Sequence, residues 1–151
     1  MALRMDFEEI LKILVERGWG RDLSTSLFFS LNPGEEKTIA FVPGQGNPPG
    51  RITPIYLDLD TDPDMSIQVD VTNDGTKLIN TVHMNSKNRI HFYKGYGKLI
   101  VSQNSFVIKL KNIETDEISN INFEFVGIEV NKDTLDRIKQ LYDRILYGVR
   151  L

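Results

Sequence analysis

Cysteine is absent from this 151-residue chain, and histidine occurs only twice and tryptophan once. Without cysteine the chain has no disulfide framework, no thiol nucleophile and no zinc-thiolate site. His83 and His91 flank an expected turn, but a metal site built on them would lack a third ligand nearby in sequence. The glycines of "PGQGNPPG" have neither dinucleotide nor phosphate-loop spacing, and no serine lies in a nucleophile elbow. We therefore expect a protein that is not an enzyme.

Long apolar runs and an excess of positive charge are missing as well. The opening segment "MALRMDFEEILKILVERGWG" carries acidic residues inside its apolar stretch and has no small-residue cleavage site. We therefore expect neither a signal peptide nor a membrane span there. The 18 basic and 21 acidic residues give a formal net charge of -3, which argues against a general nucleic-acid binder. We expect synthesis in the cytoplasm and no nucleic-acid or membrane partner.

Both ends of the chain carry helical patterns. Residues 1–20 have an apolar stripe with Gly18 as the stop, and residues 131–149 have another, with Asn131 or Asp133 as the cap. The second stripe is wider than a helix on one sheet edge requires. We therefore expect one row to pack on the domain and another to form an interface with a further subunit. The residues expected at that interface are Tyr142, Leu146 and Val149.

Between the helices, residues 23–130 change to a period of two, which is typical of strands with one buried face. Signals such as "NPGE", "TDPD" and "NDG" separate about eight short strands. No repeat or long linker divides the chain. We predict a single domain over residues 1–151, an antiparallel β-sandwich of jelly-roll or immunoglobulin-like type with a helix at each end. We also expect a bulge at Gly127 and a mobile loop over residues 43–50.

The segment "YLDLDTDPDM" places aspartates at every second position. If its turn joins two paired strands, Asp58 and Asp60 point outward and Asp58 lies opposite Asp70. Like charges opposed across a sheet cost up to about 1 kcal/mol, and a calcium ion bound by Asp58, Asp60 and Asp70 would offset that cost. EF-hand spacing is absent, because Pro63 stands where glycine is required. A neighbouring lysine or simple solvation would relieve the repulsion equally well.

The segment "HFYKGYG" gathers three aromatic residues and a lysine in a turn-rich stretch. Aromatic faces supply apolar area at small entropic cost, so Phe92, Tyr93 and Tyr96 could stack on sugar rings. The alternative is that Phe92 belongs to the core and the tyrosines cover a sheet edge. A carbohydrate-binding or adhesion module, with or without calcium, would depend on this segment or on the acidic one.

A family resemblance rests on the order of three features. A proline-glycine turn follows the first strands, then comes "DMSIQVDVTNDGTKLI", and then "FVIKLKNIETDEISNINFEFVGIEV". This order resembles the small β-sandwich proteins that decorate or join the heads and tails of bacteriophages and archaeal viruses. The resemblance carries over no functional residue. It implies a structural protein of the virion, a capsid-decoration or tail-associated component that assembles in symmetric copies with itself and with other virion proteins.

Overall fold

The computed structural model describes residues 9, 13, 16–84, 89–92 and 100–147, with the side chains of 83–84 and 141–147 left outside that description. Most of the segment expected to form the N-terminal helix therefore lies outside the described residues. The end of that segment is described. The Arg17 N–H donates to the Ile13 carbonyl over 3.0 Å, and Gly18 has a φ of 76°. Gly18 is thus the stop that the sequence predicted, because a positive φ costs glycine little.

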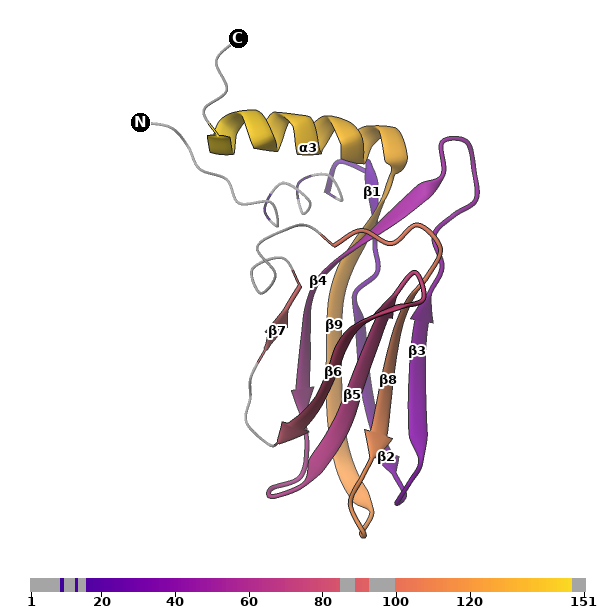
Figure 1. Ribbon diagram of the computed structural model, residues 1–151, viewed down its shortest axis with the longest axis vertical. Helices are drawn as coiled ribbons and strands as arrows, with labels where there is room; N and C mark the ends of the chain where they lie inside the picture. The colour runs from indigo at the N-terminus through magenta and orange to yellow at the C-terminus, as the bar shows by residue number, and fades with distance from the viewer. Residues whose placement is uncertain (1–8, 10–12, 14–15, 85–88, 93–99, 148–151) are drawn as a thin grey trace.

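The described elements from residue 20 onward are strands followed by one long helix (Figure 1). Their bounds are β1 Gly20–Asp22, β2 Thr25–Leu31, β3 Glu36–Phe41, β4 Gly50–Asp60, β5 Ser66–Asn73, β6 Thr76–Met84, β7 Ile90–His91, β8 Phe106–Asn112, β9 Ile118–Asn131 and α3 Lys132–Tyr147.

These strands form two antiparallel sheets packed face to face. Sheet A has the order β2, β9, β4, β7, and sheet B has the order β3, β8, β5, β6. Both β1 and β2 pair with the same edge of β9, β1 with its C-terminal end and β2 with the part before it. From β2 to β9 the chain changes sheet at every connection between described strands except the β5–β6 hairpin. This is the strand order of a jelly roll. The predicted antiparallel sandwich is therefore confirmed, and of the two predicted types it is the jelly roll.

The β5–β6 hairpin shows how local sequence sets a turn. Asp74 and Gly75 have φ values of 52° and 81°, the positive pair that a two-residue type I′ turn requires. The "NDG" signal is therefore a hairpin turn, as expected. The Asp74 carboxylate also ties this turn to the start of β8, because it accepts hydrogen bonds of 2.6–3.1 Å from the backbone N–H groups of Gln103, Asn104 and Ser105.

The main core lies between the two sheets and follows the predicted alternation. Sheet A contributes Leu57, Leu59, Ile121, Phe123 and Phe125, and sheet B contributes Ile67, Val69, Val71, Ile108 and Leu110. Phe125 stacks on Phe41 with ring centroids 4.8 Å apart and lies 5.6 Å from the ring of Phe106. The rings are therefore held on several sides, which fixes the distance between the sheets.

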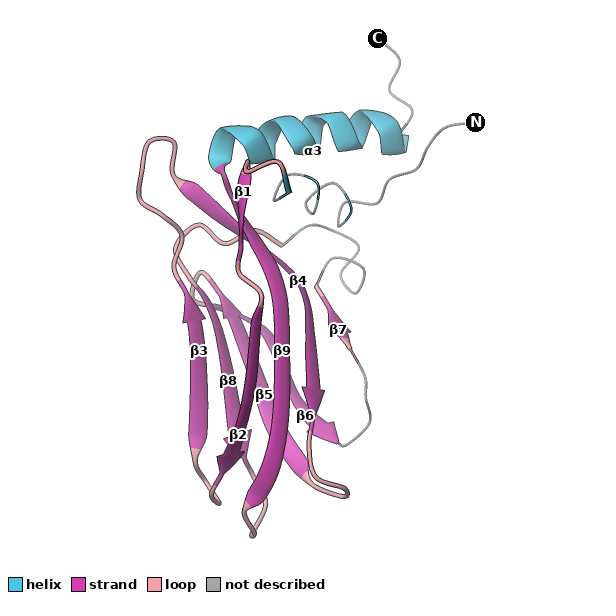
Figure 2. Cartoon of the chain, turned by 180° about the vertical axis from the view of Figure 1, so that it is seen from behind, coloured by secondary structure: helices cyan, strands magenta, loops and turns pink. Residues whose placement is uncertain are grey.

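A second, smaller apolar cluster lies on the opposite face of sheet A, where α3 crosses one end of the sheet (Figure 2). It consists of Ile55, Ile128, Val130 and Leu135, with Ile138 packed against it. The Asn131 side chain caps the helix by accepting the Thr134 N–H over 2.7 Å, so Asn131 is the cap and Asp133 is not. Among the described residues no helix is long and apolar enough to cross a membrane.

The bulge expected at Gly127 lies instead on the neighbouring strand. The register of β4 against β9 shifts between Pro54 and Tyr56, while β9 continues without interruption. Ile128 and Val130 are buried because α3 covers the outer face at that end, and not because β9 changes face. Gly127 has a different role. A Cβ atom there would lie 2.6 Å from the ring of Phe125, so the ring occupies the space that any side chain would need.

Candidate functional site

The three aspartates that were candidate calcium ligands in the sequence are not brought together. Asp58 and Asp60 lie on β4 in sheet A, whereas Asp70 lies on β5 in sheet B. The predicted opposition of Asp58 and Asp70 is wrong because the TDPD turn crosses from one sheet to the other. Asp58 faces Glu124, and Asp70 lies 3.9 Å from the Lys77 ammonium. No group of three or more histidine, aspartate or glutamate side chains in the described part of the chain is arranged to hold a metal ion.

Phe92, the first aromatic residue of the "HFYKGYG" segment, differs from the sugar-stacking prediction. Phe92 is fully buried in the main core and meets Phe106 edge to face, with ring centroids 5.4 Å apart. The alternative prediction, that Phe92 belongs to the core, is therefore the correct one. Tyr93 and Tyr96 lie outside the described residues. His83 and His91, which flank the expected turn in the sequence, lie on β6 and β7, and these strands belong to different sheets.

The interface predicted on the C-terminal helix remains a prediction. Tyr142 and Leu146 belong to α3, but their side chains are outside the description, and Val149 lies beyond the described residues. The described side chains of α3 show one packed row, formed by Leu135 and Ile138, and exposed residues such as Arg137 and Lys139 on the other sides.

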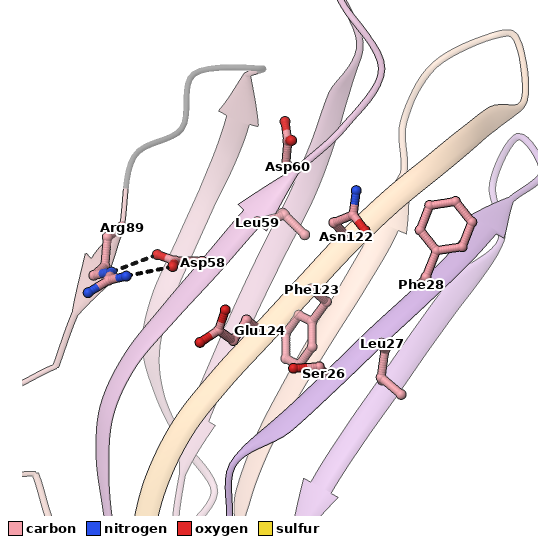
Figure 3. Close-up of a pocket in the computed structure, with 10 residues that line it drawn as sticks. All are labelled: Ser26, Leu27, Phe28, Asp58, Leu59, Asp60, Arg89, Asn122, Phe123 and Glu124. Carbon is pink, nitrogen blue, oxygen red and sulfur yellow. Dashed lines mark hydrogen bonds and ion pairs between the residues drawn. The ribbon is translucent and has the colours of Figure 1, made fainter.

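A groove of about 580 Å³ lies on the outer face of sheet A, at the end that α3 leaves uncovered. Its volume falls in the range of about 300–1,000 Å³ that is usual for small-ligand sites. Figure 3 shows the residues that line it, which are Ser26, Leu27, Phe28, Asp58, Leu59, Asp60, Arg89, Asn122, Phe123 and Glu124. The groove spans β2, β9 and β4, and Arg89 lies beside them just before β7.

The strand register arranges the outward side chains of the groove in two rows. Residues directly opposite one another across the strands are Ser26, Glu124 and Asp58 in one row, and Phe28, Asn122 and Asp60 in the next. Adjacent strands are about 4.8 Å apart and residues two apart on a strand about 7 Å, so the six positions cover roughly 10 Å by 7 Å. A rigid sheet therefore holds polar and aromatic groups in a fixed array.

Arg89 is held in place by two groups at the edge of the groove, the Asp58 carboxylate and the ring of Tyr56. Its guanidinium donates to both oxygens of Asp58, each over 2.9 Å, and its central carbon lies 3.7 Å from the ring centroid of Tyr56. The Tyr56 hydroxyl in turn donates to Glu124 over 2.8 Å. The Arg89 charge thus compensates the repulsion between Asp58 and Glu124, which face each other across the strands.

These contacts reinforce the ordinary protonation states of Tyr56 and Arg89. Burial and the hydrogen bond to Glu124 raise the pKa of the Tyr56 hydroxyl, so it stays a neutral donor near pH 7. The hydrogen bonds to Asp58 raise the pKa of the Arg89 guanidinium, which is a cation throughout the physiological range. The groove therefore presents carboxylate acceptors and guanidinium donors side by side at neutral pH.

Phe28 is the aromatic residue of the groove, and 66% of its surface is exposed. It points outward because its neighbours Leu27 and Phe29 pack against the main core. The alternation in "SLFFSL" already places Leu27 and Phe29 inward. The sequence alone could therefore have indicated that Phe28 is an aromatic residue on the outward face. No sequence pattern indicated that Arg89 belongs to this groove, because Arg89 lies 31 residues from Asp58 in the sequence.

A second polar feature surrounds the Glu129 carboxylate at the other end of β9. Glu129 accepts the Gly44 N–H over 2.7 Å and forms an ion pair with Arg21. A Cβ atom at Gly50 would lie 2.1 Å from a Glu129 carboxylate oxygen, so a side chain there would displace the carboxylate from the Gly44 N–H. The loop 43–50, expected to be mobile, is thus attached to the sheet by these contacts. Trp19, which is largely exposed, lines a hollow beside this loop.

No family model and no curated protein matches the sequence. Several solved structures are distantly similar. The structure of the infectious bursal disease virus Gt strain matches with a TM-score of 0.37 and 12% identity over 74% of this chain and 33% of that one. Dimeric latent PorU from Porphyromonas gingivalis matches with a TM-score of 0.34 and 9% identity over 72% and 13%.

A cycloisomaltooligosaccharide glucanotransferase from Paenibacillus sp. matches with a TM-score of 0.32 and 11% identity over 66% of this chain and 13% of that enzyme. The chain therefore spans a third or less of the length of each of these three proteins. Because all three TM-scores are low, the function has to be argued from the site itself.

Proposed function

We propose that the protein is a non-enzymatic structural component of a virion, of the capsid-decoration or tail-associated kind, which assembles in symmetric copies with itself and with other virion proteins. The observation that carries this proposal is the jelly-roll strand order, with β2, β9, β4 and β7 facing β3, β8, β5 and β6. Viral capsid domains use this architecture, although lectins and cupins use it as well. The sequence resemblance to small virion sandwiches agrees with the same strand order.

The C-terminal helix is the element that we propose contacts a neighbouring subunit. Only Leu135 and Ile138 of its described side chains pack on sheet A. The apolar stripe continues in the sequence C-terminal to these two residues, through Tyr142, Leu146 and Val149. Residues 131–151 contain five basic and three acidic residues, against nine and thirteen in residues 23–130. This difference in charge would favour the approach of the helix to the sandwich of another copy over short distances.

The test is the mass of the protein in solution, measured by light scattering and native mass spectrometry over a range of concentrations. We expect a multimer for the unaltered chain, and a folded protein of lower mass for the paired change Tyr142→Ser with Leu146→Ser. The matched control is Lys139→Ser with Gln140→Ser, which introduces the same serines at exposed positions of the helix and should leave the mass unchanged. A monomer at all concentrations, or a folded Tyr142/Leu146 variant of unaltered mass, would contradict the proposal.

A further inference from the structure

The groove on sheet A combines three kinds of group on one surface. Asp58, Asp60 and Glu124 supply acceptors, Arg89 supplies donors, and the amide of Asn122 supplies both. Phe28 adds an exposed aromatic ring in the same row as Asn122 and Asp60 (Figure 3). A ligand that fits this surface needs hydroxyl or amide groups on neighbouring atoms and an apolar face of its own.

The charges in the groove narrow the class of ligand. Three carboxylates against one guanidinium give the lining a formal charge of -2, which disfavours an anionic ligand. A cationic ligand would have to approach the fixed Arg89 guanidinium in order to reach Asp58 or Glu124, which already interact with Arg89 and Tyr56. An uncharged hydroxyl group is repelled neither by the carboxylates nor by Arg89, because it donates to a carboxylate and accepts from a guanidinium or an amide N–H.

The fixed position of these groups adds to the argument. Asp58 and Glu124 come from adjacent strands of a paired sheet, and Arg89 is held by a bidentate ion pair and by the ring of Tyr56. Side chains that are already ordered lose little entropy when a ligand binds. Phe28 is held by β2, and its ring faces solvent before any ligand arrives, so stacking on it requires no rearrangement of the core.

We infer that this groove is a binding site for an uncharged oligosaccharide, with the ring of Phe28 against a sugar face and with Asp60, Asn122 and Arg89 bonded to its hydroxyl groups. The array of roughly 10 Å by 7 Å has room for a short stretch of a glycan chain. The inference does not rest on the proposed assembly role, because no residue of α3 lines the groove and its lining is complete within one chain. Binding requires no metal ion and no second copy of the chain.

The experiment is a titration of the full chain, labelled with nitrogen-15, with neutral linear hexasaccharides of glucose, mannose and galactose, followed by backbone amide spectra and calorimetry. Hexalysine and a hexagalacturonate serve as cationic and anionic probes. We expect at least one neutral hexasaccharide to shift the amide signals of Phe28, Asp60 and Asn122. Phe28→Ala and Asn122→Ala should each weaken its binding roughly tenfold or more.

Two control variants make the result specific to the groove. Val42→Ala removes another exposed apolar side chain, 62% exposed, that does not line the groove. Trp19→Ala removes the exposed aromatic residue beside the glycine-rich loop. Both should leave the affinity within twofold of the unaltered chain, and the melting temperature of Phe28→Ala should stay unchanged because this residue is exposed. Three results would overturn the inference: no shift with any neutral sugar, groove shifts with hexalysine alone, or binding that Trp19→Ala abolishes and Phe28→Ala does not.

Discussion

Replacing Gly127 by alanine should destabilise the domain by about 2–3 kcal/mol, although the same change in an ordinary strand is stabilising by roughly 0.5–1 kcal/mol. The φ of Gly127 is not positive, so the backbone itself accepts alanine. The cost arises from contact, because the new Cβ atom would lie 2.6 and 2.7 Å from two ring carbons of Phe125. Carbon atoms approach one another favourably only to about 3.5–4.0 Å.

The ring of Phe125 cannot move aside at low cost. It is fully buried, stacks on Phe41 at 4.8 Å between centroids and lies 5.6 Å from Phe106. To relieve this contact, several packed rings or β9 itself would have to shift. We therefore expect a loss of stability in the upper part of the range that is usual for overpacking a core. For a domain of this size the melting temperature should fall by about 4–12 °C.

The assay is urea denaturation and thermal melting of Gly127→Ala beside Gly46→Ala. At Gly46 the nearest heavy atom would be 3.7 Å from the added Cβ, an ordinary contact, so this control should be neutral or slightly stabilising. A double variant that also carries Phe125→Leu should be more stable than the sum of the single changes predicts, by about 1 kcal/mol or more. The reasoning is refuted if Gly127→Ala melts at or above the temperature of the unaltered protein.

Three further predictions concern charged groups. Hydrogen bonds from backbone N–H groups outweigh the effect of burial and lower the pKa of the Asp74 carboxyl below its ordinary value of 3.8. Ionised Asp74 should therefore stabilise the fold above pH 3.8, and this stabilisation should be lost as the pH falls through the lowered pKa. The melting temperature of Asp74→Asn should accordingly vary less with pH in this acid range than that of the unaltered protein. Arg89→Met should cost about 1 kcal/mol, and less at molar salt, because it leaves Asp58 facing another carboxylate; denaturation at two salt concentrations measures this. Glu129→Ala should cost about 1–2 kcal/mol and speed hydrogen exchange at Gly44, because that N–H loses its acceptor; unchanged exchange there would contradict the role of Glu129.

Much of the local structure follows from the sequence alone. The period of two along β4 and β5 correctly places Leu57 and Val69 inward, because alternation depends only on the extended backbone. The "NDG" turn is correct for the same reason, since it depends on a few consecutive residues, and Asn131 is one of the two caps that the sequence predicted for the C-terminal helix. The mainly β sandwich and its C-terminal helix also follow from these periods.

The partners of each strand were decided only by the tertiary structure. An alternating strand satisfies its pattern equally well in a hairpin or across a sandwich, so sequence could not tell that β4 and β5 belong to different sheets. That choice separates Asp58 from Asp70 and places Asp58 opposite Glu124 instead. Arg89 reaches the same site from 31 residues away. The groove exists because pairing between distant strands brings these side chains to one face, and such pairing is set by the packing of the whole core and not by any local signal.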